Sequence, residues 1–487
     1  MRLAAKAKNP SKNPLSSMSD NDRTANRDLT RRDFVIAAGT VTTAGAASAF
    51  PAPAIQKVSA AGNQVLYGAI GTGAQGSYLL RHMAGLQGCR CAAVCDTDGA
   101  NLKKGVAAAE TNPQAYQDYR ELLARKDIDA VVIATPLSTH FPIARDALTA
   151  GKHVFCEPPL VFKPEEVHAL RALAAERPKQ VIQAGFQRRY SKFYQVAKMM
   201  VAKGLIGNVT HVAAQWHRNP GWLIPPDPAS ERYRYWMIFR EYSAGLAGEL
   251  GSHQIDVACW MFNAQPEYVI GIGGQEFVRD GRDIDDNIQL LYRYRRGQKL
   301  IYSAISTNQH LPLFGGMRAE CGETIMGTGG TIEITLGSDK EPCIALWYYE
   351  PRPPLVTRGT NYVEPPVIGG ATLGSMGNGR KGFPLLLEKD QFQDGESFLG
   401  RELKYARRWL YSQGVTLPEE DRNPVDLQME SFFDCCRTGD SPKADVEAGL
   451  ANSTAVILSN LAMGEERRVY FNEIEKMGLN AKPGAKD

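Results

Sequence analysis

The sequence lacks any long uninterrupted hydrophobic run, and it carries almost no excess of charge of either sign. It has 56 lysine and arginine residues against 53 aspartate and glutamate residues, a net charge of +3 over 487 residues. Its most basic stretch is the interrupted run Arg293–Arg296. Because nucleic-acid-binding proteins usually present a basic patch or stripe, the sequence predicts no nucleic-acid partner. A stable membrane span, which needs about 20 apolar residues, is not expected either.

The nine cysteines do not have the spacing of a disulfide framework. Several of them, such as Cys91 and Cys156, lie in apolar segments that resemble strands. Cys435 and Cys436 are adjacent, which suits neither a simple bridge nor a set of metal ligands. Free cysteine is among the most frequently buried residues, so we expect small buried hydrophobes.

The amino-terminal part of the chain has the three parts of an export signal. Residues 1–29 are polar, and Arg31-Arg32 then precedes the weakly apolar stretch Phe34–Phe50. The small residues Ala47-Ser48-Ala49 fit a cleavage site. Paired arginines before a diluted apolar stretch resemble a twin-arginine signal; the alternative is an ordinary basic terminus with a chance arginine pair. The expected divisions are a disordered start and signal peptide over residues 1–49 and a linker over residues 50–62.

This signal predicts a periplasmic or secreted protein that crosses the membrane already folded, with the twin-arginine export machinery as a partner. A cofactor loaded in the cytoplasm could then travel with the protein. Cysteines could likewise be buried before they meet an oxidising compartment.

A glycine-rich turn follows the first strand-like segment after the expected signal. Residues 64–70 resemble a short buried strand, and they lead into Gly71-Thr72-Gly73-Ala74-Gln75-Gly76 and then a helix-like segment, Ser77–Ala84. In the dinucleotide fingerprint the first glycine makes the tight turn and the second lets the backbone approach the pyrophosphate. The third allows close packing of helix on strand, and the helix N-terminus favours the phosphates.

An acidic residue, Asp96, closes the next strand-like segment, about 25 residues after Gly71. A carboxylate at this place binds the adenosine ribose and repels a 2′-phosphate, so NAD is expected rather than NADP. The alternative is that Asp96 is a helix N-cap for residues 97–109, and the two roles are compatible.

Strand-like and helix-like segments then alternate up to residue 186. Such alternation predicts a parallel, doubly wound sheet whose ligands bind at the carboxyl ends of the strands. Thr135-Pro136, Glu157 and Gln187 are expected along that edge. The predicted strands are residues 130–134, 152–156 and 180–184, and the predicted helices are residues 119–124, 141–150 and 164–175.

Several motifs in this order resemble the glucose–fructose oxidoreductase / inositol dehydrogenase / MocA (Gfo/Idh/MocA) family. The resemblance covers about residues 63–345 and 425–472. It implies an α/β fold: an N-terminal Rossmann domain followed by an α+β domain with a large, open, mostly antiparallel sheet. The motifs are Gly71–Gly76, Ala134-Thr135-Pro136 with His140, Gly151–Val154 leading to Glu157, Gly185–Tyr190, Gly248–Asp256, Met326–Glu333 and Phe432–Arg437.

The domain divisions follow from this resemblance. Residues 63–186 are expected to bind NAD(P), and residues 187–472 to form the substrate and oligomerisation domain, with a tail over residues 473–487. One sheet face would cover nicotinamide and substrate, and the other is often buried in an oligomer, so a homodimer or homotetramer is expected. Residues 348–423 are rich in Pro and Gly and hold one helix-like stretch, 397–411; we interpret them as an inserted arm or a pocket lid. The strands expected in this domain are residues 209–216, 268–273, 287–293, 300–306 and 330–336.

The resemblance also assigns site residues. His253 is the predicted general base and Glu249, four residues earlier, its orienting partner or a hydroxyl ligand. Arg189, Tyr190 and His217 are predicted to bind substrate, although Arg189 could instead form an interdomain salt bridge. No metal site is predicted, because His217, Glu249 and His253 have no compact ligand spacing. The predicted cofactor contacts are Gly71, Gly73, Ala74, Gln75, Gly76, Asp96, Thr135, Pro136, His140, Glu157, Pro158 and Gln187.

One position departs from the family. Its dehydrogenases usually carry Glu-Lys-Pro at the end of a Rossmann strand, whereas this chain has Glu157-Pro158-Pro159. Proline has no proton to exchange, so the role of that lysine cannot be transferred. Either the proton shuttle lies elsewhere, for which Lys163 is one candidate, or activity is lost, or the bound cofactor serves a chemistry without net dehydrogenation.

Three functions remain open at this stage. The first is an exported oxidoreductase that acts on a secondary alcohol of a sugar, polyol or glycoside, with tightly bound NAD(P). The second is a glycoside hydrolase or lyase that oxidises C3 transiently. The third is an inactive protein that binds cofactor or sugar.

Overall fold

The computed structural model describes residues 64–218, 232–308, 321–336, 344–349, 367–368, 371–372, 383–387, 398–416 and 422–477. The predicted signal peptide and linker, most of the predicted arm or lid and most of the predicted tail lie outside these residues. Those predictions are therefore not tested by the structure.

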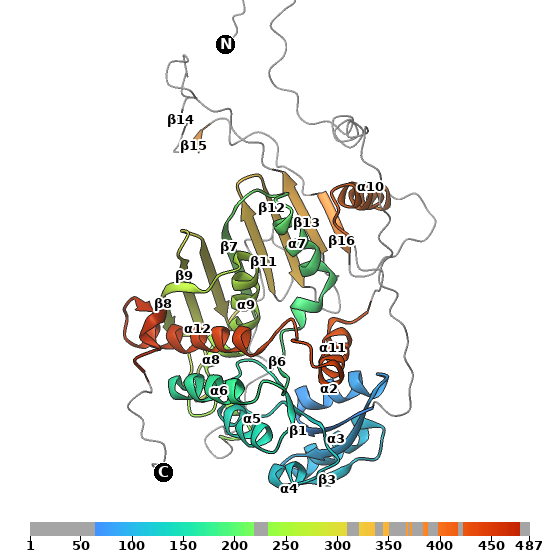
Figure 1. Cartoon of the computed structure of the whole chain (residues 1–487). Coiled ribbons are helices and arrows are strands. Elements are labelled where there is room, and N and C mark those ends of the chain that lie inside the picture. The colour runs from blue at the N-terminus through green and yellow to red at the C-terminus, as the bar shows by residue number, and fades with distance from the viewer. Residues whose placement is uncertain are drawn as a thin grey trace, which may run out of the picture. The chain divides into compact units, whose positions relative to one another are not determined.

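The first sheet has six parallel strands in the order β3-β2-β1-β4-β5-β6 (Figure 1). This confirms the predicted doubly wound sheet. The four residues of β4 are all buried, because helices cover both faces of a parallel sheet. The sequence did not predict β3, whose three residues are partly or fully exposed. The strands are β1 (Val65–Ile70), β2 (Cys89–Cys95), β3 (Gln114–Tyr116), β4 (Ala130–Ile133), β5 (His153–Cys156) and β6 (Ile182–Ala184).

Helices connect these strands at about the predicted places. Two starts differ from the prediction by more than one residue. Helix α2 begins at Ala74 and not at Ser77. Helix α3 begins at Gly99, because the Asp98 side chain accepts hydrogen bonds from the backbone N–H groups of Ala100 and Asn101. Asp98, and not Asp96, is thus the N-cap of this helix. The helices are α2 (Ala74–Ala84), α3 (Gly99–Ala109), α4 (Tyr119–Leu123), α5 (His140–Thr149) and α6 (Pro164–Glu176), with the short 3-10 turn η1 (Leu137–Thr139) before α5.

The second sheet has nine strands in the order β16-β13-β12-β11-β7-β10-β9-β8-β17. Its pairs are antiparallel except β7 with β10, which confirms the predicted α+β domain. The strands are β7 (Val209–His217), β8 (Pro266–Gly274), β9 (Asn287–Tyr294), β10 (Lys299–Ile305), β11 (Cys321–Gly327), β12 (Gly330–Leu336), β13 (Ile344–Tyr349), β16 (Phe383–Leu387) and β17 (Val469–Tyr470).

Helices of the second domain cover one face of its sheet and contact the Rossmann domain. α9 (Gly251–Phe262) packs on β7 and β10, and α12 (Val446–Gly464) contacts β8 and α6 and lies between the two sheets (Figure 1). The remaining elements are η2 (Gln187–Tyr190), α7 (Lys192–Ala202), η4 (Trp236–Ile238), α8 (Gly245–Glu249), β14 (Val367–Ile368), β15 (Ala371–Thr372), α10 (Phe398–Ser412), α11 (Pro424–Thr438) and η7 (Phe471–Glu473).

The C-terminal helix α11 returns to the Rossmann domain and completes its core. Phe433 packs on Tyr67 of β1, with ring centroids 5.1 Å apart, and Phe432 packs on Phe155 of β5, at 5.7 Å. All four side chains are buried. Burial of so much aromatic surface stabilises the Rossmann sheet with residues that lie about 250 positions or more from it in the sequence.

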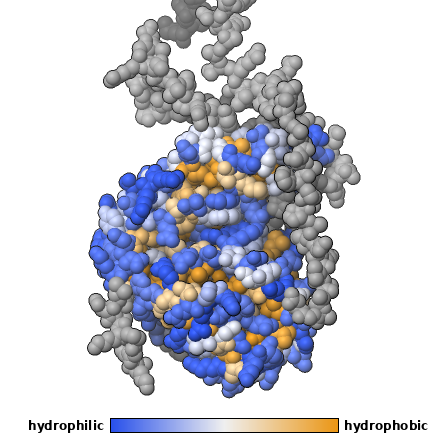
Figure 2. Space-filling view, viewed as in Figure 1, coloured by the Kyte–Doolittle hydropathy of each residue, from blue (hydrophilic) through white to orange (hydrophobic). Residues whose placement is uncertain are grey.

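The eight cysteines within the described residues form no disulfide; six are buried and two are half-buried, as expected for small hydrophobes. Among the same residues, no helix is both long and apolar enough to cross a bilayer. The face of the molecule in Figure 2 is a mosaic of hydrophilic and hydrophobic residues.

Candidate active site

The glycine turn after β1 has the geometry of a phosphate cradle. Gly71 has φ +85°, and a Cβ there would lie 2.6 Å from the Ala134 carbonyl oxygen. A Cβ on Gly76 would collide with the carbonyl oxygen of Gly71. At Gly73, by contrast, only the Asn101 side chain comes within 4 Å, at 3.8 Å. Two glycines are therefore required by packing, and the third leaves an open surface.

The first turn of α2 faces this open surface. Gly73 is the N-cap of the helix and provides no side-chain cap, and Ala74 and Gln75 are exposed. The Ser77 hydroxyl donates to the Thr72 carbonyl oxygen at 2.7 Å and fixes the loop. The unpaired N–H groups of a helix start attract anions, so this turn suits a diphosphate.

Asp96 is held beside the turn. One carboxylate oxygen accepts a hydrogen bond from the Thr72 backbone N–H at 2.7 Å, and the other accepts one from the Asp98 N–H at 2.9 Å. The residue is half-buried directly after β2. Asp96 therefore lies beside the glycine turn, at the carboxyl end of β2.

His140 connects the loop after β4 to the loop after β5. It is 3% exposed, with Nδ1 2.8 Å from the Pro159 carbonyl oxygen and Nε2 2.9 Å from the Thr135 carbonyl oxygen. The Thr139 hydroxyl also donates to the Pro136 carbonyl oxygen at 2.7 Å. Because both ring nitrogens contact backbone, His140 positions the loops around a cofactor and has no nitrogen left for the cofactor itself.

Glu157 joins the end of β5 to the glycine turn. The Gln75 side-chain amide donates to its carboxyl at 3.0 Å, and burial raises the pKa of Glu157 to about 7, against the lowering effect of that bond. Pro158 follows, half-buried. Lys163 is exposed at the N-cap of α6, which fits a surface role rather than a proton shuttle.

Glu249 and His253 are not the partners that the sequence suggested. The helix is interrupted at Leu250, so Glu249 ends α8 and His253 lies in α9. Glu249 accepts a hydrogen bond from the Ser243 hydroxyl at 2.9 Å, and no hydrogen bond to His253 is found within the described residues. Burial raises the pKa of Glu249 to about 7.

His253 lies between two aromatic rings. Its centroid is 6.3 Å from that of Phe186, nearly perpendicular, and 6.2 Å from that of Trp216. Burial, together with the positive charge of Arg188, lowers the pKa of His253 to about 3. Its Nδ1 is buried without a hydrogen-bond partner in the described part of the chain. The ring is therefore neutral at physiological pH.

Sequence reasoning missed Arg188, the charge beside His253. Arg188 is 3% exposed and forms an ion pair with Glu323, which is fully buried. Its guanidinium also lies over the Trp216 ring, 5.4 Å from the centroid. In the sequence, the only indication of its role was its place in the Gly185–Tyr190 motif, and nothing there distinguishes Arg188 from the adjacent Arg189.

Two predicted substrate residues belong to the packed interior instead. Arg189 donates to both carboxylate oxygens of Asp256, at 2.7 and 2.9 Å, and to the Lys443 carbonyl oxygen at 2.6 Å. This is a salt bridge, but not the interdomain one that was the alternative, because Arg189 and Asp256 both lie in the predicted second domain. Tyr190 is 3% exposed and bonded to the Ser431 hydroxyl, so its assignment to substrate is also corrected.

His217 lies on the wrong face of its sheet to bind substrate. Trp216 faces α9, as its contact with His253 shows, and neighbouring residues of a strand point to opposite faces. His217 accordingly contacts Ser303 across the far face, at 2.8 Å. Trp216, which the sequence also suggested beside His217, is the one of the two that faces His253. No three His, Cys, Asp or Glu side chains of the described residues are arranged to hold a metal ion.

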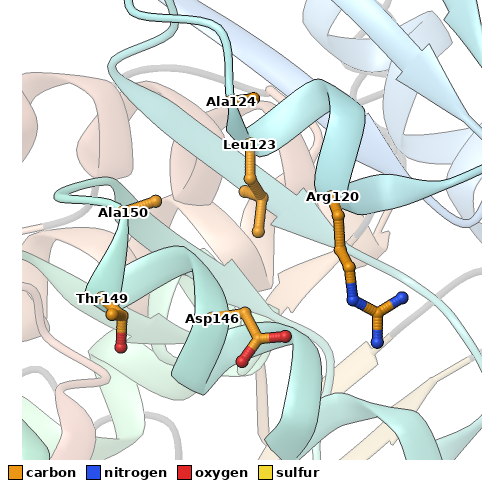
Figure 3. Close-up of a pocket in the computed structure, with 6 residues that line it drawn as sticks. All are labelled: Arg120, Leu123, Ala124, Asp146, Thr149 and Ala150. Atoms are coloured by element: carbon orange, nitrogen blue, oxygen red, sulfur yellow. The ribbon is translucent and has the colours of Figure 1, made fainter.

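The remaining predicted residues lie at the carboxyl ends of the Rossmann strands. Thr135 and Pro136 follow β4 at the edge where β1 ends, and half-buried Gln187 opens η2 directly after Phe186. A separate surface pocket lies between α4 and α5 and includes neither the glycine turn nor His253 (Figure 3). Its one acid is already bonded to Tyr119 and Arg145. The pocket is lined by Arg120, Leu123, Ala124, Asp146, Thr149 and Ala150.

Solved structures share this fold. An aldose–aldose oxidoreductase from Caulobacter crescentus, in complex with glycerol, superposes with a TM-score of 0.61 at 17% identity, covering 84% of this chain and 99% of that one. A levoglucosan dehydrogenase in complex with NADH and levoglucosan gives the same score, identity and coverage. At such identities the likeness is one of fold.

Relatives match by sequence. The inositol 2-dehydrogenase of Rubrobacter xylanophilus is 28% identical over 272 residues, which are 56% of this chain and 71% of that protein. A glycosyl hydrolase family 109 protein of a Shewanella species is 33% identical over 170 residues, 33% of this chain and 37% of that protein. This chain therefore spans well under half the length of the second relative.

Both domains match one family. The oxidoreductase family with an NAD-binding Rossmann fold matches residues 65–186, and the GFO/IDH/MocA C-terminal domain matches residues 194–333. Together these matches cover more than half of the chain. The chain therefore belongs to the Gfo/Idh/MocA family of oxidoreductases.

Proposed function

We propose that the protein oxidises a secondary alcohol of a sugar, polyol or glycoside and passes the hydride to NAD. One chain of contacts carries the proposal, because it joins the glycine turn to His253. Gln75 is bonded to Glu157, and a Cβ on Gly185 would lie 2.8 Å from the Glu157 carboxyl. Phe186, the next residue, packs edge-on against His253. A dinucleotide on the turn and an alcohol at His253 would share one cleft.

The residues at the turn fit a dinucleotide. Gly73 leaves open space at an uncapped helix start, and Asp96 offers a carboxylate at the ribose end. That carboxylate would repel a 2′-phosphate and so favours NAD over NADP. Nicotinamide, when bound, supplies the hydride acceptor that no side chain can provide.

Two side chains are suited to move the hydroxyl proton. His253, with a pKa of about 3, stays neutral and can accept a hydrogen bond from an alcohol at any physiological pH. Glu249, with a pKa of about 7, exchanges protons readily near neutrality. Glu249 would thus take over the proton exchange of the amine that Pro158 cannot supply, and His253 would hold the hydroxyl.

A second candidate is a glycoside-cleaving reaction in which the hydride returns to the substrate. The glycosyl hydrolase family 109 relative supports it, as does the proline where family dehydrogenases carry lysine. This reaction would release an aglycone without net production of NADH.

Export and assembly complete the proposal. The twin-arginine pattern at Arg31-Arg32 supports a periplasmic or secreted location, where free NAD is scarce, so the cofactor should be tightly bound. Ile272 and Ile301, which are 73% and 47% exposed, lie on the sheet face opposite α9. Exposed apolar residues on one face support a homo-oligomer, a dimer or a tetramer.

The two candidates separate in one experiment. The purified protein is mixed with NAD and either a polyol, an aldose or a nitrophenyl glycoside, and NADH fluorescence and free nitrophenol are recorded. Net NADH from a polyol or aldose supports the dehydrogenase. Nitrophenol without net NADH supports the second candidate, and neither signal over a broad panel would overturn both.

A further inference from the structure

A segment of the second domain, residues 232–243, forms a small folded unit of its own. Ile238 and Phe239 are buried against Ile284. Arg240 donates to the Asp283 carboxylate through its backbone N–H, at 2.6 Å, and to Asp285 through its guanidinium, at 2.9 Å. These contacts anchor the segment to the loop between β8 and β9.

Its two ends reach the Rossmann domain at different strands. The Ser138 backbone N–H, in η1 after β4, donates to the Tyr242 carbonyl oxygen at 3.1 Å. Tyr233 packs edge-to-face on Tyr242, with ring centroids 5.5 Å apart. On the side of β2, burial and then the nearby Asp96 carboxylate raise the pKa of Tyr233.

The strand order decides what lies beneath this tyrosine pair. β1 lies between β2 and β4, and the glycine turn leaves the carboxyl end of β1. A segment that reaches from Asp96, after β2, to Ser138, after β4, must cross the edge where the turn lies. The Tyr233–Tyr242 pair therefore lies at the edge of the Rossmann sheet where the glycine turn follows β1, and where a dinucleotide would bind on the proposed function.

We infer that Tyr233 and Tyr242 form the outer wall of the nucleotide site and hold the adenosine half of a dinucleotide against the glycine turn. Tyr233 is 46% exposed, which leaves part of its ring free to cover a base or ribose. Stacking of a base on an aromatic side chain increases the affinity of the protein for a nucleotide, whichever base it carries. This wall would slow cofactor release, as a location without free NAD requires.

The test is the affinity and dissociation rate of NADH, measured by fluorescence on full-length protein stripped of nucleotide. Tyr233→Ala should raise the Kd and the dissociation rate about tenfold, the loss of one base–aromatic stack. Tyr233→Phe keeps the ring and should stay close to wild type. The matched control is Tyr470→Ala, since Tyr470 is 40% exposed and stacks edge-on with Tyr268 at 5.6 Å, on the far edge of the second sheet.

The inference rests on the proposed function, and the two fail differently. If wild type binds NADH and Tyr233→Ala binds it within about twofold, the tyrosine wall is overturned while the function stands. If wild type binds no dinucleotide at all, the proposed function is overturned and the wall with it. A loss shared equally by Tyr470→Ala would also overturn the wall, because it would reflect a general loss of structure.

Discussion

Burial shifts the pKa values of Glu249 and His253, the two groups proposed to act on the substrate, in opposite directions. A low-dielectric environment disfavours the charged form, so the pKa of Glu249 rises to about 7 and that of His253 falls to about 3. At neutral pH the imidazole is thus uncharged, and the carboxyl is divided between its two forms. Arg188 contributes to the low pKa of His253, and its ion pair with Glu323 holds that positive charge in place.

Replacing His253 should remove the acceptor for the substrate hydroxyl. His253→Phe keeps a ring but has no nitrogen to accept a hydrogen bond from the substrate hydroxyl, so we expect kcat/KM to fall by at least about 10². Binding of NADH should change little, because the glycine turn is untouched. Steady-state kinetics and NADH titration of the same preparation check this, and a variant with wild-type turnover would contradict the assignment.

The Glu249 carboxyl should lower the free energy of unfolding of the protein at high pH. Its folded pKa of about 7 lies above the ordinary value of 4.5, so the folded state holds the proton more tightly. The resulting stabilisation is complete below pH 4.5 and is lost as the pH rises through 7. Glu249→Gln should therefore match wild type near pH 4.5 and exceed it by up to about 3 kcal/mol at pH 8. Urea unfolding at both pH values checks this; an equal difference at both would contradict the burial of the carboxyl.

At the scale of elements, the Rossmann sheet depends on a helix from the far end of the chain. α11 brings Phe432 and Phe433 onto β5 and β1, and the same apolar cluster includes Met429. The N-terminal strands therefore do not have a complete core until the C-terminal residues have docked.

Truncating Phe432 should destabilise the whole chain. A fully buried Phe→Ala change costs about 3–5 kcal/mol through lost apolar burial and the cavity left behind. Phe277, which is 66% exposed, provides the matched control, for which about 0.5 kcal/mol or less is expected. Thermal unfolding of both variants compares them. Equal losses would mean that α11 is not part of the Rossmann core.

The sequence predicted elements whose pattern is local and missed what depends on distant packing. The buried apolar runs of β1 and β4 and the glycine turn could be recognised in the sequence itself. The docking of α11 and the pairing of Arg189 with Asp256 depend on residues far apart in the chain. The break at Leu250 was not predicted either. The strand pattern also could not decide between Trp216 and His217, because neighbouring residues of a strand point to opposite faces of a sheet.

At the scale of the whole molecule, we propose that the protein binds its cofactor inside the cell and is then exported with it. Residues 1–49, with Arg31-Arg32, would direct export of the folded protein, and the two domains would carry the cofactor in the cleft between them.

Changing Arg31-Arg32 to Lys-Lys should stop export. The protein should then accumulate in the cytoplasm of a bacterium that has the twin-arginine pathway, whereas wild type is found in its periplasm. Cell fractionation and immunoblotting measure the two pools. Equal periplasmic amounts of both forms would contradict the signal.

The most direct test of the site is NADH binding to wild type and to Gly73→Asp. Only at Gly73 does the turn leave open space, and an acidic side chain would place bulk and negative charge where the diphosphate should lie. We predict that wild type binds NADH and that Gly73→Asp, at unchanged thermal stability, binds it at least about 100-fold more weakly. Equal binding by the two proteins, or no binding by wild type, would contradict the assignment of this turn to the cofactor.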